Sequence, residues 1–114
     1  MTTSIMFYKG ETWSFDGIVK HRDGSALDIT GGNVEVRIMS DAACVLKSTS
    51  SDVTVTSATG GTYVFSVAAD DSRLTPISDG QYVLEVDAIG SDGAVSVQNR
   101  LLCLVISGGR ALFP

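Results

Sequence analysis

The 114-residue chain has few of the residues on which enzyme and metal chemistry most often depend. It contains one histidine, two cysteines, and eight Lys and Arg residues against 13 Asp and Glu, which gives a net charge of −5. The basic residues are scattered, so the sequence lacks the basic patch that neutralises phosphates, and nucleic acid is not expected as a partner. Two cysteines and one histidine without a Cys-x-x-Cys motif argue against a structural zinc site.

The sequence also lacks a long apolar run. The longest, LLCLVI at 101–106, is far shorter than the ~20 residues of a membrane-spanning helix, so no membrane partner is expected. The N-terminal residues MTTSIMFYKG do not form a signal peptide, because no basic segment leads into an apolar one. We therefore expect synthesis in a reducing cytoplasm, where Cys44 and Cys103 stay free thiols. A disulfide between them is the alternative, and an intermolecular bridge formed after lysis is left open.

Apolar and polar residues alternate along most of the chain. The alternating segments are 13–19, 34–38, 53–55, 63–67, 82–88 and 95–97. This period of two indicates strands with one buried face, and dipeptides such as Asp-Gly and Gly-Gly between them favour tight turns. We predict an all-β fold: a single-domain antiparallel immunoglobulin-like β-sandwich of seven or eight strands over residues 1–107, with a flexible C-terminal arm at 108–114. A small barrel is the alternative.

Two local patterns refine this prediction. Tyr82 follows an Asp-Gly turn and opens an alternating strand, as does the tyrosine corner of immunoglobulin-like sandwiches. Segment 70–77 has room for about one helical turn, with Asp70-Asp71 as N-terminal capping charges. The predicted core consists of Trp13, Phe15, Val19, Val34, Val36, Ile38, Tyr63, Phe65, Val67, Tyr82, Leu84, Val86 and Val97.

No residue pattern predicts catalysis or a cofactor. His21 lies in a polar turn, the serines form no Gly-x-Ser-x-Gly elbow, and the loop aspartates are not spaced as calcium ligands. The glycine-rich stretches join strands to strands, whereas phosphate-binding loops open a helix. We expect no enzyme activity, no metal and no cofactor.

Aromatic residues raise the possibility of a sugar-binding face. Trp13, Tyr8, Tyr63 and Tyr82 could stack on pyranose rings. Trp13 has the parity of apolar neighbours on its strand, which favours a core position. Tyr8 is the surface candidate.

The last strand is apolar on both faces over part of its length. Its odd positions, from Val95 to Val105, are predicted to face the core. Its even positions are polar at first and then become Leu102, Leu104 and Ile106. A single sandwich would expose these three side chains, so we expect them to be covered either by another subunit or by the chain's own loop or tail.

Three stretches carry a resemblance to a known family: FYKGETWSF (7–15), DGSALDITGGNVEVRI (23–38) and DGQYVLEV (79–86). Together they resemble the N-terminal domain family of bacteriophage baseplate upper proteins and related small virion proteins. The matching residues are Lys9, Gly10, Glu11, Thr12, Asp28, Ile29, Thr30, Gly31, Gly80 and Tyr82. Asp28 and Thr30 have a plain structural interpretation as well, because both side chains can satisfy backbone amides at a turn.

The resemblance implies a non-enzymatic immunoglobulin-like module of the virion that attaches components to a tail, baseplate, neck or fibre. Its expected partners are other virion proteins and further copies of itself in a symmetric oligomer or array. Baseplate proteins continue into a longer segment, whereas this sequence ends at SGGRALFP. The alternatives are a capsid decoration protein of the same fold, a host-glycan-binding module, and a small enzyme or enzyme inhibitor. The predicted interface residues are Leu102, Leu104, Ile106, Leu112, Phe113 and Tyr8, with the arm reaching a neighbouring copy or folding back over its own strand.

Overall fold

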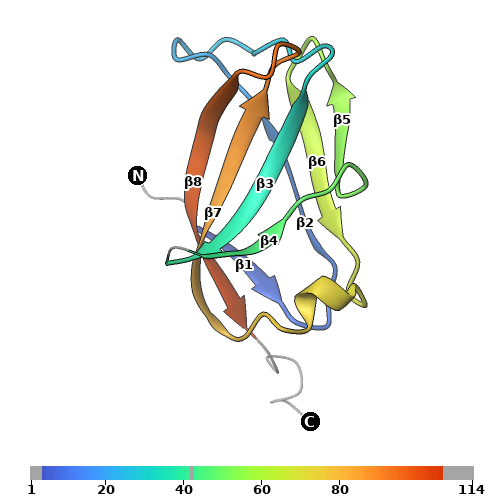
Figure 1. The fold of residues 1–114 in the computed structure, drawn as a ribbon, viewed down its shortest axis with the longest axis vertical. Coiled ribbons are helices and arrows are strands. Elements are labelled where there is room, and N and C mark those ends of the chain that lie inside the picture. Colours follow the sequence, from blue (N-terminus) through green and yellow to red (C-terminus); the bar gives the residue numbers. More distant parts are fainter. Residues whose placement is uncertain (1–3, 42, 107–114) are drawn as a thin grey trace.

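A computed structural model describes residues 4–41 and 43–106 as two β-sheets packed face to face (Figure 1). The strands are β1 (Ser4–Tyr8), β2 (Trp13–Ile18), β3 (Asn33–Ser40), β4 (Ala43–Lys47), β5 (Val53–Ser57), β6 (Thr62–Val67), β7 (Gly80–Ile89) and β8 (Val95–Ile106), with one 3-10 turn, η1 (Ser72–Leu74). The predicted all-β sandwich is confirmed. The proposed arm at 108–114 lies outside the described residues.

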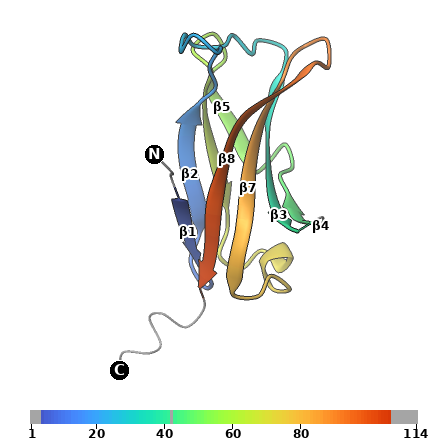
Figure 2. The ribbon, with the colours of Figure 1, turned by 90° about the vertical axis from the view of Figure 1, so that its left-hand side faces the viewer.

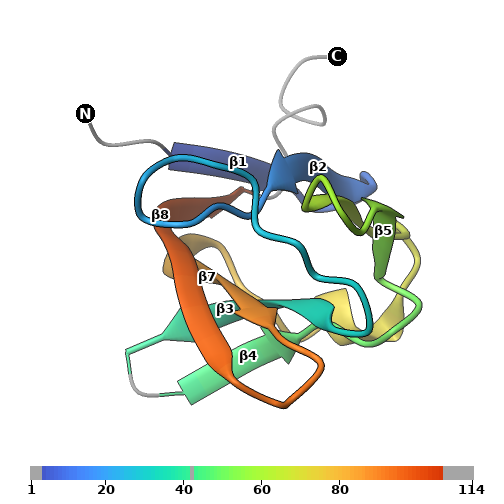
Figure 3. The ribbon, with the colours of Figure 1, turned by 90° about the horizontal axis from the view of Figure 1, so that it is seen from above.

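The larger sheet has the strand order β1-β8-β7-β3-β4 and the smaller sheet the order β2-β6-β5. Figure 3 shows β7, β3 and β4 on one side of the sandwich and β2 and β5 on the other. The order β8-β7-β3 facing β2-β6-β5 is the arrangement of strands G-F-C and B-E-D in immunoglobulin folds. The chain therefore has an immunoglobulin-like topology.

One strand pair departs from the antiparallel prediction. β1 runs parallel to β8, with Ser4 opposite Leu102 and Tyr8 opposite Ile106, and Figure 2 shows the two strands side by side. Gly10 makes this possible, because its φ of +91° turns the chain so that β1 joins the larger sheet and β2 the smaller. The N-terminal segment is thus an edge strand and a core strand joined at a glycine turn.

Aromatic rings occupy the centre of the core. Phe7 and Trp13 stack in parallel with ring centroids 4.8 Å apart, and Phe65 packs against Phe7 at 6.4 Å. The indole Nε1 of Trp13 donates a hydrogen bond to the Tyr8 carbonyl at 3.0 Å, so the buried ring leaves no donor unpaired. Phe7 is 3% exposed and belongs to the core, although the prediction did not include it.

The predicted core is buried with two exceptions. Phe15 is half-buried and packs against Phe65, with ring centroids 5.2 Å apart. Val97 is 54% exposed, so its assignment to the core was wrong. The pairing of β7 with β8 shifts register between Val86 and Asp87, which leaves one extra residue on β8. A one-residue bulge moves every side chain beyond it to the opposite face.

The same bulge corrects the inward face predicted for the last strand. Cys103 and Val105 are buried and Leu101 is half-buried, as expected from their odd positions. On the other side of the bulge, Val95 and Val97 lie opposite Ile89 and Asp87 and are 60% and 54% exposed. The alternation is therefore correct for the second half of β8 and inverted for the first half.

The tyrosine corner is confirmed. The hydroxyl of Tyr82 donates a hydrogen bond to the backbone carbonyl of Ser78 at 2.6 Å, four residues upstream. This bond ties the start of β7 to the connection that precedes it.

A carboxylate pair clamped by Arg73 holds the 3-10 turn. Asp71 caps the turn by accepting a hydrogen bond from the Arg73 amide at 2.9 Å, so the capping role predicted at this pair of aspartates is confirmed for Asp71. The Arg73 guanidinium also donates to both carboxylate oxygens of Asp52 at 2.7 and 2.8 Å. Hydrogen bonds from Arg73 lower the pKa of Asp52 and bring the pKa of Asp71 to about 2. These aspartates are structural.

Both cysteines are free, Cys44 exposed and Cys103 buried, which agrees with the predicted free thiols. Burial raises the pKa of Cys103 to about 11, so its thiolate is scarce at neutral pH. We expect iodoacetamide to alkylate Cys44 in the folded protein and Cys103 after unfolding. Mass measurement of freshly isolated, non-reduced protein tests this: a mass lower by two hydrogens would contradict free thiols.

Candidate functional site

An apolar surface covers one end of the outer face of the larger sheet, the end at which β1 pairs with β8. It is built by three neighbouring strands, and we call it the β1–β8 patch. Its members are Met6, Tyr8, Val83, Leu102, Leu104 and Ile106. Met6, Tyr8, Val83 and Leu102 are between 36% and 45% exposed, and the other two are half-buried.

The strand register brings these side chains together. In the parallel pair, Met6 lies opposite Leu104 and Tyr8 opposite Ile106, and in the antiparallel pair Val83 lies opposite Leu102. Side chains directly opposite each other on paired strands point to the same face. The buried residues between them, such as Phe7 and Cys103, point to the core. One face of the sheet is therefore filled by the core and the other carries a contiguous apolar surface.

Charged side chains occupy the other end of the same outer face. Arg100 pairs with Glu85 at 2.8 Å, and Arg37 pairs with Glu35 at 2.6 Å. These residues lie on β3, β7 and β8 beyond the apolar patch. The outer face therefore has an apolar half, the patch, and a half that carries these ion pairs, which we call the charged half and which also exposes Val95 and Val97.

Asp87 is the unusual member of the charged half. It is 2% exposed, its Oδ1 has no hydrogen-bond partner among the described residues, and its Oδ2 lies 3.8 Å from the Arg37 guanidinium. Desolvation, reinforced by the negative charges of Glu85 and Glu35, raises the pKa of Asp87 to about 6. Asp87 is thus a buried acid with Glu85 and Glu35 as negative neighbours and Arg37 as its positive one.

Four of the six predicted interface residues come together in the β1–β8 patch: Tyr8, Leu102, Leu104 and Ile106. Leu112 and Phe113 lie outside the described residues. Met6 and Val83 are members that the sequence analysis missed. Met6 could not be placed because the parallel pairing of β1 with β8 has no local sequence signal. Val83 was detectable, because it follows Tyr82 in a strand whose alternate residues were assigned to the core.

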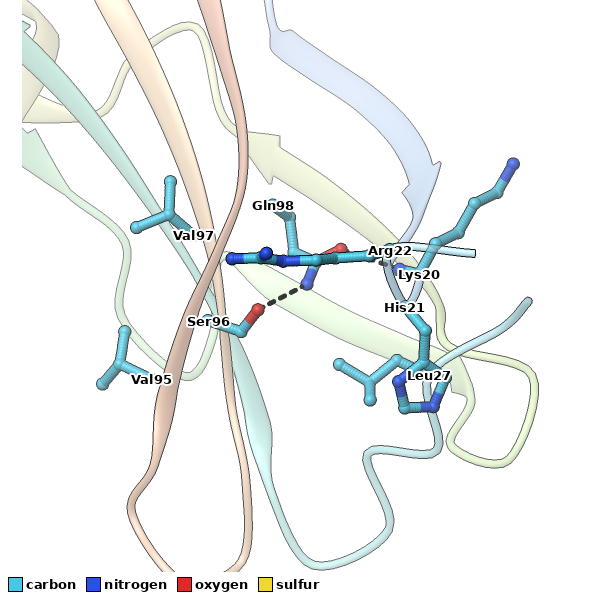
Figure 4. Close-up of a pocket in the computed structure, with 8 residues that line it drawn as sticks. All are labelled: Lys20, His21, Arg22, Leu27, Val95, Ser96, Val97 and Gln98. Carbon is cyan, nitrogen blue, oxygen red and sulfur yellow. Dashed lines mark hydrogen bonds between the residues drawn. The ribbon is translucent and has the colours of Figure 1, made fainter. Parts of the chain in front are cut away.

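A groove lies at the opposite end of β8, between that strand and the connection from β2 to β3 (Figure 4). It has a volume of about 710 Å³, and its lining includes three consecutive basic residues, Lys20, His21 and Arg22. The Lys20 amide donates to Gln98 Oε1 at 2.7 Å, and Gln98 Nε2 donates to Ser96 Oγ at 3.0 Å. These bonds hold the connection beside β8.

The remaining residues considered in the sequence analysis are the other aromatic residues and His21. Trp13, Tyr63 and Tyr82 are buried, so Tyr8 is the member of that set with an exposed ring. His21 is exposed in its turn, where its carbonyl accepts from Gly24 at 3.0 Å. Within residues 4–41 and 43–106, no three His, Cys, Asp or Glu side chains are arranged to hold a metal ion. In the same part of the chain, no helix has the length and apolar character to cross a membrane.

Comparison with known proteins adds little. No protein-family model matches the sequence, and no curated protein matches it. Among solved structures, CopC from Methylosinus trichosporium OB3b is similar over 93% of this chain and 86% of CopC, at 12% sequence identity and a TM-score of 0.47. At this score and identity the similarity carries no argument about function.

Proposed function

We propose that this chain is a non-enzymatic structural protein of a bacteriophage virion that assembles with other virion proteins and with itself. The β1–β8 patch is the observation that carries the proposal. Its four exposed members are large apolar side chains that are 36–45% exposed, so covering what remains of each would contribute about 0.6–1.3 kcal/mol before ordering costs. A contiguous apolar patch of this kind on the face of a sheet is typical of a protein–protein contact.

The virion assignment rests on the family resemblance, and several of the matching residues have structural roles in this fold. Lys9 Nζ donates to the carbonyls of Thr75 and Ile77, which links the β1–β2 turn to the segment after η1. The Asp28 carboxylate accepts from the Thr30 amide at 2.9 Å and from its hydroxyl at 2.6 Å. The matching residues thus hold turns in place, which suits a module whose function depends on shape.

The proposal includes the C-terminal arm, 108–114. β8 ends at Ile106, a member of the patch, and the arm follows it closely in the sequence. Within the arm, Leu112 and Phe113 have the character to fill an apolar groove on a neighbouring copy. We propose that patch and arm form one contact between subunits or between subunit and particle.

Val83→Asp tests the patch. Val83 is 44% exposed on central strand β7, and a charge buried there in an assembled complex would be unpaired. We expect the variant to weaken self-association or binding to purified particles about tenfold or more, measured by analytical ultracentrifugation and particle cosedimentation. Val64→Asp is the matched control, since Val64 is 36% exposed on β6, the central strand of the other sheet.

The control should behave as the parent, and both variants should keep the parent's circular dichroism spectrum. If Val83→Asp assembles and binds as well as Val64→Asp, the patch is not the contact.

Deleting 110–114 tests the arm in the same assays: unchanged assembly with a lower melting temperature would mean that the arm covers its own chain. Glycan binding that is lost in Tyr8→Ala, with no particle binding, would replace the structural role with a host-glycan module. Mass spectrometry of the purified particle and its subassemblies distinguishes a tail component from a capsid decoration protein.

A further inference from the structure

The first half of β8 is a free strand edge in the part of the chain that the structure describes. β7 pairs with β8 along its length, whereas β1 pairs with it from Leu102 to Ile106. The stretch Val95–Leu101 therefore has a described strand on one side. Alternate residues of an unpaired edge present their backbone N–H and C=O groups outward, ready to bond to a further strand.

The basic groove runs along this free edge. A second hollow of about 150 Å³, lined by Phe15–Ile18 of β2, shares Gln98 with the main groove. The two hollows therefore meet at Gln98 and follow β8 from Val95 to Leu101. Figure 4 shows Ser96 and Gln98 pointing toward the β2–β3 connection, with Val95 and Val97 on the other side of the strand.

The charge of the groove is positive at its wide end. Lys20, His21 and Arg22 are exposed, and none of them takes part in a salt bridge within the described residues. In Figure 4 the Arg22 side chain extends across the groove toward β8. The carboxylate of neighbouring Asp23 accepts from the Ser25 amide at 2.9 Å and hydroxyl at 2.6 Å, and its negative charge also interacts with His21. The acidic member of the lining, Asp16, is in the smaller hollow.

We propose that this groove binds an extended acidic segment of a partner protein, which adds to the free edge of β8 as a further strand. Backbone hydrogen bonds to Val95–Leu101 hold the segment, as in other cases of strand addition. Its acidic side chains point to the groove side, toward the Arg22 side chain that crosses the groove. Its apolar side chains point to the outer face and continue the surface of Val95 and Val97. The inference rests on the groove and does not depend on the β1–β8 patch.

An acidic polypeptide suits the groove better than an oligonucleotide does. The three basic residues are confined to one connection, while the chain as a whole carries a charge of −5. A polyanion that extends beyond the groove would meet a repulsive field, whereas a short acidic strand is neutralised locally. The open backbone edge also matches a polypeptide, which supplies the alternating donors and acceptors that a strand ladder requires.

The test is an NMR titration of the isotope-labelled full chain with a capped peptide of alternating Glu and Val. We expect shifts confined to the Val95–Leu101 edge and the Lys20–Arg22 connection. Arg22→Glu should weaken binding about tenfold, because it removes one attraction and adds one repulsion at an exposed site. Lys47→Glu is the control: it makes the same charge change at a 63% exposed lysine on β4 and should leave affinity nearly unchanged.

Two further probes complete the test. A peptide of the same sequence with N-methylated backbone amides should lose binding, because it cannot form the ladder. A Lys-Val peptide of equal length should bind at least tenfold more weakly. The proposal is overturned if millimolar Glu-Val peptide causes no shifts at the edge, if the N-methylated peptide binds equally well, or if a single-stranded oligonucleotide binds the groove and the peptide does not.

Discussion

Replacing Trp13 or Phe65 with alanine is expected to lower the free energy of unfolding by about 3–5 kcal/mol. Both side chains are 0% exposed, and both contact the ring of Phe7, so either truncation leaves a cavity between the two sheets. Trp13→Ala also leaves the Tyr8 carbonyl without its indole donor. A loss of this size is a large part of the ~5–15 kcal/mol that holds a typical domain folded.

Chemical denaturation followed by circular dichroism measures the effect, with Val64→Ala as the control. Val64 adjoins Phe65 on β6 but is 36% exposed, so its truncation should change stability by less than about 0.5 kcal/mol. If Trp13→Ala or Phe65→Ala unfolds at nearly the same denaturant concentration as the control, the aromatic rings do not form the centre of the core.

The fold could be predicted from local patterns because most of its strands alternate cleanly. Val34, Val36 and Ile38 on β3 are buried at every second position, and Tyr82 makes the corner bond that its sequence context indicates. Such features are local, since a strand face and a turn residue are determined within a few positions of the chain.

The errors arose where a non-local pairing decides the outcome. Val97 has the correct spacing for the core, but a bulge opposite the Val86–Asp87 step moves it to the outer face. Met6 became part of the candidate site because β1 pairs in parallel with β8, almost 100 residues along the chain. The groove beside β8 was missed for the same reason, because Arg22 and Ser96 are neighbours only after the β2–β3 connection is in place.

Replacing Asp87 with asparagine is expected to stabilise the protein at neutral pH. The ordinary pKa of an aspartate is 3.8 and that of Asp87 is raised to about 6, so the fold favours the protonated form. A raised pKa gives stability that is fully present below the unfolded value and is lost as the pH rises through the folded value. The parent should therefore lose stability between about pH 4 and pH 6 on this account, and stay at the lower level at neutral pH.

The expected gain of Asp87→Asn at neutral pH is about 1–3 kcal/mol, since a shift of about two pKa units is worth at most ~3 kcal/mol. Asparagine keeps the size of the side chain and removes the buried charge that lies beside Glu85 and Glu35.

Asp70→Asn is the matched control, because it makes the same charge change at an exposed loop position. Thermal denaturation of parent and variants at pH values on both sides of the titration measures the difference. The advantage of Asp87→Asn should disappear at the acidic end, where the parent's carboxyl is protonated as well. An equal gain at both ends would show that asparagine acts through packing or hydrogen bonding, and a loss at neutral pH would show that the ion pair with Arg37 outweighs the burial of the charge.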